Sequence, residues 1–483
     1  MAVRARLTAP KEVKTTWDWH SLKSASLPSS MIFGGDRRME AENFLASGFT
    51  TRQSIIDKSS GWALFSDVAR TWQPSRLKGI QVSPEYGTPF LAATQVFDVR
   101  PSPRKWLSLD RTGDHAQRYV AQGTILLTCS GSVGRATLAD SSLSNTLISH
   151  DLLRIEAKDS NLSGWMYAYL RSPTVRAMMT SAQYGHMIKH LEISHLDNLP
   201  YIDPPVDTIE ECNVIASNII GARNKAHDLV TKAEGLYLSA VGPALNTNID
   251  AVGFITSSRA LFGKGRRLEG HYHNPAARAA DDAVKQNNRS VDRLADLVER
   301  VFIPGRFKHV YGPDGLPYLD SAQILEVSPD VDKHVLSLNA ERKAGYLVDA
   351  GTIIIPCSGQ THGIIGSVVL AGKWHENKVL TNHILRIIPK DNPSVRIGYL
   401  QVVLGHPTLG RPRVIKGAYG SSVPELSVVD IENLSVPRIG FDLETEIADA
   451  IEEAFALMAY SNELEDNISD IAESIVRDFL NHQ

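Results

Sequence analysis

Two long stretches of the chain carry apolar or small residues at spacings that alternate between three and four. The first spans residues 206–240, after Asp203-Pro-Pro, and the second spans residues 441–481, after Gly440. This spacing is typical of a seam along one face of a helix. Helices of some 35–40 residues would be about 50–60 Å long, which is more than one small domain covers. We therefore predict that the two helices pair with each other, with packing of each helix on its own domain as the alternative.

The predicted seam is built from large aliphatic side chains, with Ser461 as a polar residue in the same register. Its main positions are Ile209, Ile219, Leu229, Leu236, Ile447, Leu457, Leu464, Ile468, Ile471 and Ile475.

Outside these helices, short apolar runs alternate with Gly and Pro turns. Residues 88–99, 122–128 and 352–356 are typical of buried or half-buried strands, whereas residues 165–179 and 291–301 favour helices. This mixture predicts α/β or α+β domains.

The chain also repeats itself, at an offset that stays between 228 and 236 over some 165 residues. The same short motifs recur in the same order in both halves. They include Pro74-x-Arg76-x-Lys78 with Pro304-x-Arg306-x-Lys308, Gly87-x-Pro-x-Leu-x3-Gln95 with Gly315-x-Pro-x-Leu-x3-Gln323, and Gly123-Thr-Ile-x3-Cys129-Ser-Gly with Gly351-Thr-Ile-x3-Cys357-Ser-Gly. Chance does not preserve such an order, so each half is one structural unit of a domain followed by a helix.

This duplication predicts a pseudo-twofold molecule in which an antiparallel coiled coil separates two related domains. We place an N-terminal extension at residues 1–29, domain 1 at 30–205, a central spacer helix at 206–250, domain 2 at 251–439 and a C-terminal spacer helix at 440–483. Two tandem copies with unrelated tasks are the alternative interpretation of the repeat.

Composition narrows the class of protein. With 43% hydrophobic and 22% charged residues the chain is typical of a globular protein. No apolar run is long enough to cross a membrane, and the N-terminus is charged where a signal peptide would be apolar. Three cysteines cannot form a disulfide framework or a four-cysteine zinc site. We therefore expect a cytoplasmic protein without membrane contact.

Charge is distributed unevenly along the chain. Residues 1–205 and 251–439 each carry a formal charge of +5, whereas residues 206–250 carry −3 and residues 440–483 carry −11. Basic blocks of this kind favour a polyanion as partner of the two domains.

The ordered motifs, seen twice, resemble those of the specificity (S) subunits of type I restriction–modification enzymes, over about residues 30 to 483. Arg37-Arg-Met-Glu-Ala-Glu and Arg266-Arg-Leu-Glu-Gly-His look like the opening of target-recognition domains in that family. The stretch from Gly123 to Gly134 looks like the family's strand followed by a Ser-Gly-x-x-Gly turn, and Ile188-Lys-His-Leu precedes a similar exit into the first helix. The chain departs from the family at the helix starts, where Asp203-Pro-Pro-Val lacks the usual Glu-Gln pair and Pro437-Arg-Ile-Gly lacks the Pro-Pro.

The resemblance implies a non-catalytic subunit that recognises a bipartite, asymmetric target in double-stranded DNA. It further implies two adenine methyltransferase (M) subunits as partners, and a restriction/translocase (R) subunit as a further candidate partner. S-adenosylmethionine would be bound by the methyltransferase, and this chain would hold no cofactor. Because the departures lie where the family holds its methyltransferase subunits, DNA recognition in another methylation-linked phage-defence complex is the alternative.

Catalytic chemistry finds little support in the sequence. Asp203-Pro-Pro-Val206 lacks the aromatic residue with which amino-methyltransferases stack a base, and no Gly-rich cofactor loop precedes it. Asp330 with Glu341-Arg-Lys343 fits the spacing of metal-dependent nucleases but has no counterpart in the first copy. Histidines lie at positions 186, 190 and 195. Two histidines four residues apart can bind zinc, but no third ligand lies at a fitting spacing. We expect no catalytic residue and no metal; a self-sufficient nuclease or methyltransferase, or a protein scaffold, are the weaker hypotheses.

For contacts to DNA we select basic and polar residues close to loops and Gly-rich turns. They are Arg76, Lys78, Arg135, His186 and Lys189 in domain 1 and Arg306, Lys308, Arg411, Arg413 and Lys416 in domain 2. The turns at residues 130–134 and 358–366 could present N–H groups to a phosphate or merely connect strands. Cys129 and Cys357, at matching places after a strand, are interpreted as buried structural thiols.

Overall fold

The structure is a computed structural model of the chain. It describes residues 24, 26–33, 41–76, 79–111, 115–182, 189–245, 253–262, 267–286, 290–336, 345–420 and 422–482.

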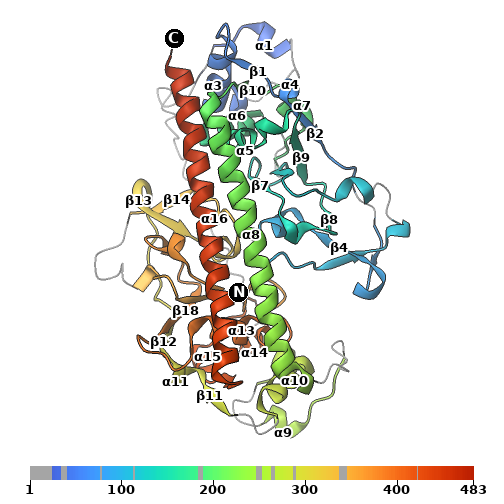
Figure 1. The fold of residues 1–483 in the computed structure, drawn as a ribbon, viewed down its shortest axis with the longest axis vertical. Coiled ribbons are helices and arrows are strands. Elements are labelled where there is room, and N and C mark those ends of the chain that lie inside the picture. The colour runs from blue at the N-terminus through green and yellow to red at the C-terminus, as the bar shows by residue number, and fades with distance from the viewer. Residues whose placement is uncertain are drawn as a thin grey trace, which may run out of the picture.

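Two long helices, α8 (Val206–Val241) and α16 (Phe441–Asn481), lie side by side through the molecule (Figure 1). Lys225 on α8 pairs with Glu453 on α16, and further along α8 Lys232 pairs with Glu446 at 2.8 Å. Since the partner's number falls as the number on α8 rises, the helices are antiparallel. The predicted antiparallel pairing is confirmed, and none of the described helices is long and apolar enough to cross a membrane.

Most of the predicted seam residues lie at the interface of the two helices, but near the end of α8 other residues are buried. Ile219, Ile447 and Ile468 are fully buried. The half-buried residues that pack against the core are Leu229, Leu236, Leu457, Leu464, Ile471 and Ile475. Near its end α8 buries Tyr237 and Val241 instead of a pure heptad seam, because it also packs on domain 2. Ile209 lies outside the buried core, at the start of the helix.

Domain 1 contains a central four-stranded antiparallel sheet and a smaller second sheet. The central sheet has the order β2 (Ala69–Trp72), β9 (Leu152–Ala157), β6 (Ile125–Thr128), β7 (Ala136–Leu138). The second sheet has the order β3 (Gln81–Val82), β5 (Lys105–Leu107), β4 (Thr88–Leu91), β8 (Leu147–Ile148). A ladder of β1 (Trp62–Leu64) and β10 (Pro200–Ile202) joins the start of the domain to its end.

Domain 2 repeats this arrangement. Its central sheet has the order β12 (Val298–Phe302), β18 (Ile384–Pro389), β15 (Ile353–Pro356), β16 (Val369–Leu370). Its second sheet has the order β14 (Lys333–Val335), β13 (Tyr311–Leu319), β17 (Val379–Leu380), and its closing ladder joins β11 (Val291–Arg293) to β19 (Ser435–Pro437). The predicted duplication of a mixed helix-and-sheet domain is therefore confirmed.

Helices cover the sheets and link them to the two long helices. In domain 1 they are α1 (Ser29–Phe33), α2 (Ala41–Leu45), α3 (Ser47–Ile56), α4 (Phe65–Val68), α5 (Ser163–Arg171), α6 (Pro173–Ala182) and α7 (Ile193–Asp197). In domain 2 they are α9 (Ser258–Leu261), α10 (Pro275–Lys285), α11 (Leu294–Leu297), α13 (Ile397–Gly405), α14 (Arg411–Lys416) and α15 (Val428–Glu432).

The helix predicted over residues 291–301 is wrong. These residues form strand β11, the one-turn helix α11 and strand β12. The apolar spacing there fits both a helix and two short strands, and pairing with β19 and β18 decides for strands. The helical prediction over residues 165–179 is confirmed, although Ser172 and Pro173 divide the stretch into α5 and α6.

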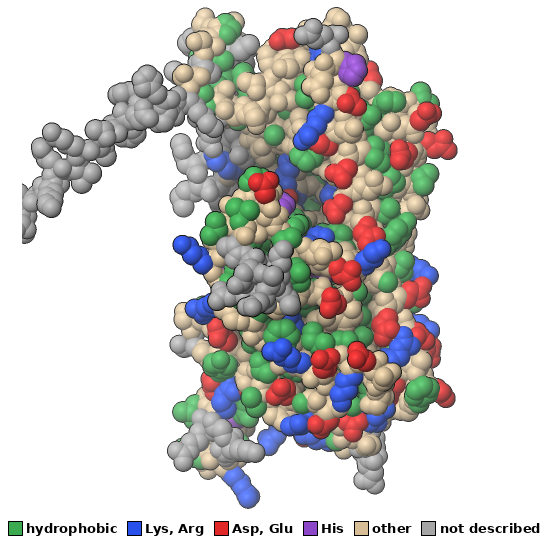
Figure 2. Space-filling model, turned by 90° about the vertical axis from the view of Figure 1, so that its left-hand side faces the viewer, with side chains coloured by type: hydrophobic (Ala, Val, Ile, Leu, Met, Phe, Trp, Pro, Cys, Tyr) green, Lys and Arg blue, Asp and Glu red, His purple; other side chains and the backbone are tan. Residues whose placement is uncertain are grey.

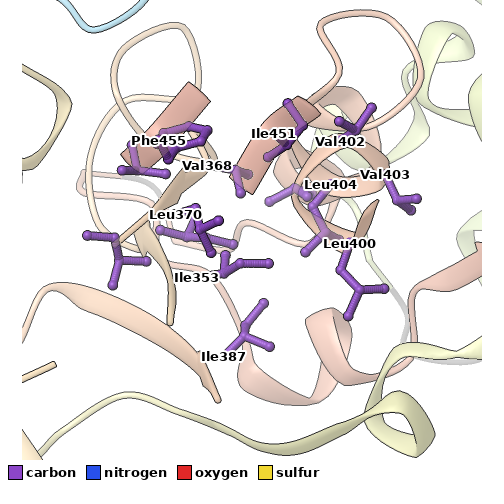
Figure 3. Close-up of a cluster of buried hydrophobic side chains, with 14 of the residues drawn as sticks. Ile353, Val368, Leu370, Ile387, Leu400, Val402, Val403, Leu404, Ile451 and Phe455 are labelled. Atoms are coloured by element: carbon purple, nitrogen blue, oxygen red, sulfur yellow. The ribbon is translucent and has the colours of Figure 1, made fainter. Parts of the chain in front are cut away.

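The long helices complete the cores of the domains. Figure 3 shows Ile451 and Phe455 of α16 beside Ile353 and Leu370 of the domain 2 sheet, with Leu400 of α13 in the same cluster. In domain 1 the far end of α16 contributes buried residues to the core in the same way. Each domain is thus fixed to both helices, with domain 1 on the start of α8 and domain 2 on its end.

Two glycines let the domain helices approach the long helices. A Cβ on Gly164 of α5 would lie 2.4 Å from the backbone N of Asn213 on α8. A Cβ on Gly398 of α13 would lie 2.6 Å from the carbonyl O of Ala448 on α16. Because Cβ atoms do not approach a backbone this closely, a larger side chain would separate the helices.

A buried ionic network joins the long helices at the domain 1 end. Glu465 of α16 is fully buried and accepts hydrogen bonds from Arg223 of α8 at 2.6 Å and from the Tyr167 hydroxyl. It also forms an ion pair with Arg171 of α5 at 2.9 Å. Arg223 also donates to Ser461 at 3.1 Å, which explains the polar residue in the predicted seam. Polar contacts of this kind restrict the register of paired helices.

Candidate nucleic-acid interface

In domain 1, polar residues gather where β2 and β6 end and β9 begins. Gln73 donates to the carbonyl O of His150 at 2.7 Å, and Ser130 Oγ lies 3.0 Å from His190 Nδ1. The Gly131 N–H donates to the carbonyl O of Lys189 at 3.2 Å. We call this group, Gln73, Ser130, His150, Lys189 and His190, sheet end 1. Its amide, hydroxyl and imidazole groups are of the kinds that hydrogen-bond to base edges.

Domain 2 has a corresponding group where β12 and β15 end and β18 begins. Ser358 Oγ lies 3.0 Å from His383 Nδ1, so the serine–histidine pair recurs. The histidines come from different places, since His190 precedes α7 whereas His383 precedes β18. Burial, with the neighbouring His383, lowers the pKa of His309, which favours the neutral form of this imidazole. Ser358, His383 and His309 define sheet end 2.

Aromatic rings surround His309 in domain 2. Ring centroids lie at 4.3 Å for Phe307, 5.2 Å for Tyr318 and 5.8 Å for Tyr311, whose side chain is exposed. The buried Nε2 of His309 has no hydrogen-bond partner among the residues that the structure describes. Aromatic faces beside cationic side chains are typical of nucleic-acid binding surfaces.

Matching cationic side chains lie along the chain next to each sheet end. The Arg70 guanidinium stacks 5.2 Å from the ring centroid of Trp72, and that of Arg300 stacks 4.3 Å from Phe302 at the corresponding position. Arg76, Arg306 and Lys308 follow on the loops and are exposed. These predicted contacts are therefore accessible to a phosphate backbone, and their role as DNA contacts stays a prediction.

Four other predicted contacts have partners inside the chain. Arg135 donates to Glu326 at 3.0 Å, and Arg411 donates to the carbonyl O of Gly363 at 2.7 Å. Arg413 and Lys416 both donate to Asp281 at 2.9 Å. Although burial acts to raise the pKa of Asp281, these two cations lower it. The proposed interface does not depend on these four residues. Lys189 is half-buried at sheet end 1, and Lys78 and His186 lie outside the described residues.

The Gly-rich turns act as connections between strands. In domain 1 the N–H groups of Gly131, Val133 and Gly134 all donate to carbonyl groups of the chain. In domain 2 those of Gly359 and Gly366 do the same. Gly131, Gly134 and Gly366 have φ values of 74°, 85° and 74°, which glycine adopts without strain. Because these donors are already used, the geometry favours the connecting role over a phosphate cradle.

The described residues offer no metal cluster of three or more His, Cys, Asp or Glu. Cys129 and Cys357 are buried, and burial raises the pKa of each thiol to about 11, so both are poor nucleophiles. Asp330 of the nuclease-like spacing is paired with Arg176 at 2.7 Å, while Glu341 and Lys343 lie outside the described residues.

The surface between the domains is recessed on one side. Figure 2 shows a hollow below the upper end of the molecule, with Lys or Arg and His side chains on its floor. Acidic side chains lie along the right-hand side of that view, with Lys and Arg side chains among them in its lower half.

Sequence reasoning missed the serine–histidine pairs and the aromatic group. The repeated Cys-Ser-Gly motif marked Ser130 and Ser358, but the partners lie 60 and 25 residues away. A usable signal was the alternation of cationic and aromatic residues in Arg306-Phe-Lys-His-Val-Tyr311, which has the period of an extended chain.

Neither a protein-family model nor a curated protein matches the chain. Among solved structures, an S subunit of a type I restriction–modification system from M. genitalium matches 89% of this chain and 98% of its own length, with 14% identity and a TM-score of 0.33. The HsdS subunit from Thermoanaerobacter tengcongensis matches 87% of this chain and 97% of its own length, with 13% identity and a TM-score of 0.27. The type IIG restriction endonuclease BpuSI matches 36% of this chain and 28% of its own length, at 12% identity and a TM-score of 0.28. The chain is thus similar over most of its length to type I S subunits, at TM-scores that leave its function to be argued from its own residues.

Proposed function

We propose that this chain recognises a bipartite, asymmetric DNA sequence and brings methyltransferase subunits to it. The observation that carries this proposal is the pair of sheet ends. Two copies of one domain hold serine–histidine pairs and exposed cations at matching places, on the two ends of one pair of helices. Two such surfaces held apart by a rod suit a target with two half-sites and a spacer.

Each sheet end would act on one half-site through the major groove, where the pattern of donors and acceptors differs for all four base pairs. Gln73, Ser130 and His190 supply hydrogen-bonding groups in domain 1, whereas Ser358, His383 and His309 supply them in domain 2. Since these sets differ, the half-sites should differ. Arg76, Arg306 and Lys308 would hold phosphates, which fixes the register without reading sequence.

The long helices would hold the partners. Val206 and Phe441 are the first residues of α8 and α16, and 81% and 75% of their surfaces are exposed. Val214 on α8 and Tyr460 on α16 are exposed too. The match between the first residues of the two helices, Val206 and Phe441, favours two copies of one partner, which we take to be the methyltransferase, with an R subunit as a further candidate.

The chain itself would not catalyse a reaction, and S-adenosylmethionine would be bound by the methyltransferase. A defence complex other than a type I enzyme that also marks DNA by methylation would use the same surfaces and is the second candidate. This second candidate is supported by the helix starts, which depart from the pattern of S subunits.

The test is a domain exchange in cells that also carry the partner methyltransferase. Residues 30–205 are replaced by the matching domain of a relative, and methylation is mapped across the genome. We expect one half-site to change while the other half-site and the spacer stay the same. A continuous target, or a change in both half-sites at once, would refute the proposal that each domain recognises one half-site. The matched control replaces residues 251–439 and should alter the other half-site.

The non-catalytic role has its own test. The purified chain is incubated with DNA, magnesium and S-adenosylmethionine, first alone and then with the methyltransferase. We expect neither cleavage nor methyl transfer by the chain alone. Activity that persists through rigorous purification would contradict the proposal.

A further inference from the structure

The two domains touch each other directly, at a place where equivalent segments meet. Residues 97–100 follow β4 in domain 1, and residues 325–328 follow β13 in domain 2. The Val99 N–H donates to the carbonyl O of Leu325, and the Val327 N–H donates to that of Phe97, both at 2.7 Å. The reciprocal bonds place Asp98 opposite Glu326 in an antiparallel bridge. We call these two segments the clasp.

The repeated glutamines identified in the sequence shape the clasp. Gln95 accepts from the Ala92 N–H at 3.1 Å and donates to the carbonyl O of Ser102. Gln323 accepts from the Asp320 N–H at 2.9 Å and donates to the carbonyl O of Asp330. Each glutamine thus ties together the two ends of the loop that carries one clasp segment, which explains why both copies of the motif contain it.

Two ion pairs close the clasp, and both run from domain 1 to domain 2. Arg135 pairs with Glu326 at 3.0 Å and stacks 4.2 Å from the ring centroid of Phe97. Arg176 of α6 pairs with Asp330 through its two terminal guanidinium nitrogens, each at 2.7 Å. Bidentate pairs of this kind fix orientation as well as distance.

The clasp is also attached to both long helices. The Ser328 N–H donates to Asn462 Oδ1 of α16 at 2.8 Å, and Arg100 pairs with Glu234 of α8. Ser328 has a φ of 50°, a conformation that a non-glycine residue adopts only when its surroundings hold it. The separation of the domains is therefore set by a contact between the domains as well as by the helices.

We infer that the clasp determines which spacer length the protein accepts between its half-sites, an inference that rests on the proposed function. One base pair more moves the second half-site by about 3.4 Å and turns it by about 34° around the DNA axis. Long helices bend gradually, so a rod alone tolerates part of this change. A rigid contact between the two domains does not.

The experiment uses the full chain. A binding selection on randomised DNA first gives the half-sites and the spacer, and duplexes with one base pair removed or added are then compared. Wild type should bind the altered spacers about tenfold or more weakly. Arg135→Ala combined with Arg176→Ala should reduce that penalty to about threefold or less and leave the half-sites unchanged. An undiminished penalty in this variant would overturn the inference.

A charge exchange guards against simple misfolding. Arg176→Asp should relax the spacer penalty, and Arg176→Asp with Asp330→Arg should restore it. The control, Arg293→Ala, breaks an exposed pair with Asp296 inside domain 2 and should change nothing. Failure of the exchange to restore the penalty counts against the clasp. If the selection with wild type enriches no sequence, the proposed function itself is refuted. This outcome can be told apart from failure of the clasp, because the selection is done before any variant is compared.

Discussion

In both domains a buried arginine binds backbone carbonyl groups at the start of an inner strand of the central sheet, β9 in domain 1 and β18 in domain 2. Arg154 in domain 1 donates to the carbonyl groups of Leu152 and Ile148, and Arg386 in domain 2 donates to the matching ones of Ile384 and Leu380. Likewise, the Tyr169 hydroxyl donates to the carbonyl O of Pro200, and the Tyr399 hydroxyl donates to that of Pro437. These buried polar contacts therefore recur in the interiors of both domains.

The sheet ends differ. Where domain 1 has Gln73, domain 2 has Ile303, and the loop Arg76-Leu-Lys-Gly79 corresponds to Arg306-Phe-Lys-His309. A buried polar group that loses its partner costs about 1–3 kcal/mol, so two copies of one domain cannot easily diverge there. Exposed groups can exchange protein partners for water, so the two domains can differ at the sheet ends, where the proposed function places base recognition.

The long helices show a second contrast, between their two ends. When Val206 is aligned with Phe441, Met458 occupies the position of Arg223 and Val230 that of Glu465. The domain 1 end therefore carries a buried ionic network, whereas the equivalent place at the domain 2 end is apolar.

The largest predicted effect on stability comes from removing the buried ionic network at the domain 1 end. Glu465→Ala leaves Arg223 and Arg171 buried without their carboxylate, which should lower the free energy of unfolding by about 3–5 kcal/mol. The matched control is Glu453→Ala on the same helix, whose exposed pair with Lys225 should cost about 1 kcal/mol or less. Urea denaturation measures both. Equal losses in the two variants would mean that the network adds nothing beyond a surface pair.

The next effect concerns the joints between the domains and the long helices. Gly164→Val and Gly398→Val should each destabilise the protein by about 1–3 kcal/mol, because the new side chain meets the backbone of α8 or α16. Thermal melting with domain-resolved hydrogen exchange should show loss of protection around α5 in the first variant and around α13 in the second. Gly221→Val is the control, since a Cβ at Gly221 on α8 meets nothing within 4 Å. Protection lost equally in both domains would contradict two separate joints.

The sequence predicted the architecture well and the site in part. Helix pairing and duplication follow from spacing over many residues, so single exceptions such as Ile209 do not matter. The site depends on contacts between distant residues, and no local pattern reports that Arg413 is held by Asp281 or that Ser358 meets His383. The helix expected over residues 291–301 is wrong for the same reason, because strand pairing across the domain decides it.

A smaller effect distinguishes the domains by pH. Burial, together with Lys378, lowers the pKa of His375 from 6.5 to about 4, and burial with Arg100 does the same for His406. The matching residues in domain 1 are Leu143 and Ser172, which do not titrate. A lowered histidine pKa contributes stability above pH 6.5 that is lost as pH falls toward 4.

Domain 2 should therefore lose protection against hydrogen exchange before domain 1 when the pH is lowered from 7 to about 4.5. His375→Leu with His406→Ser, which installs the domain 1 residues, should reduce this difference. Earlier loss in domain 1, or no response to the double substitution, would show that other groups control the acid sensitivity.

The smallest effect sharpens the comparison of the two surfaces. Arg76 and Arg306 occupy matching loops and are both exposed, so each should contact one phosphate. Arg76→Ala or Arg306→Ala should weaken binding of all sequences alike and lower the slope of log affinity against log salt by about one. His309→Ala should behave differently, because a group that reads a base relaxes discrimination at one position of one half-site and leaves the salt slope unchanged. Titrations of the full chain at several salt concentrations, on the selected target and on single-position variants of it, separate the two cases. If Arg306→Ala altered sequence preference, or His309→Ala changed only the salt slope, the assignment of cations to phosphates and of the sheet ends to bases would have to be reversed.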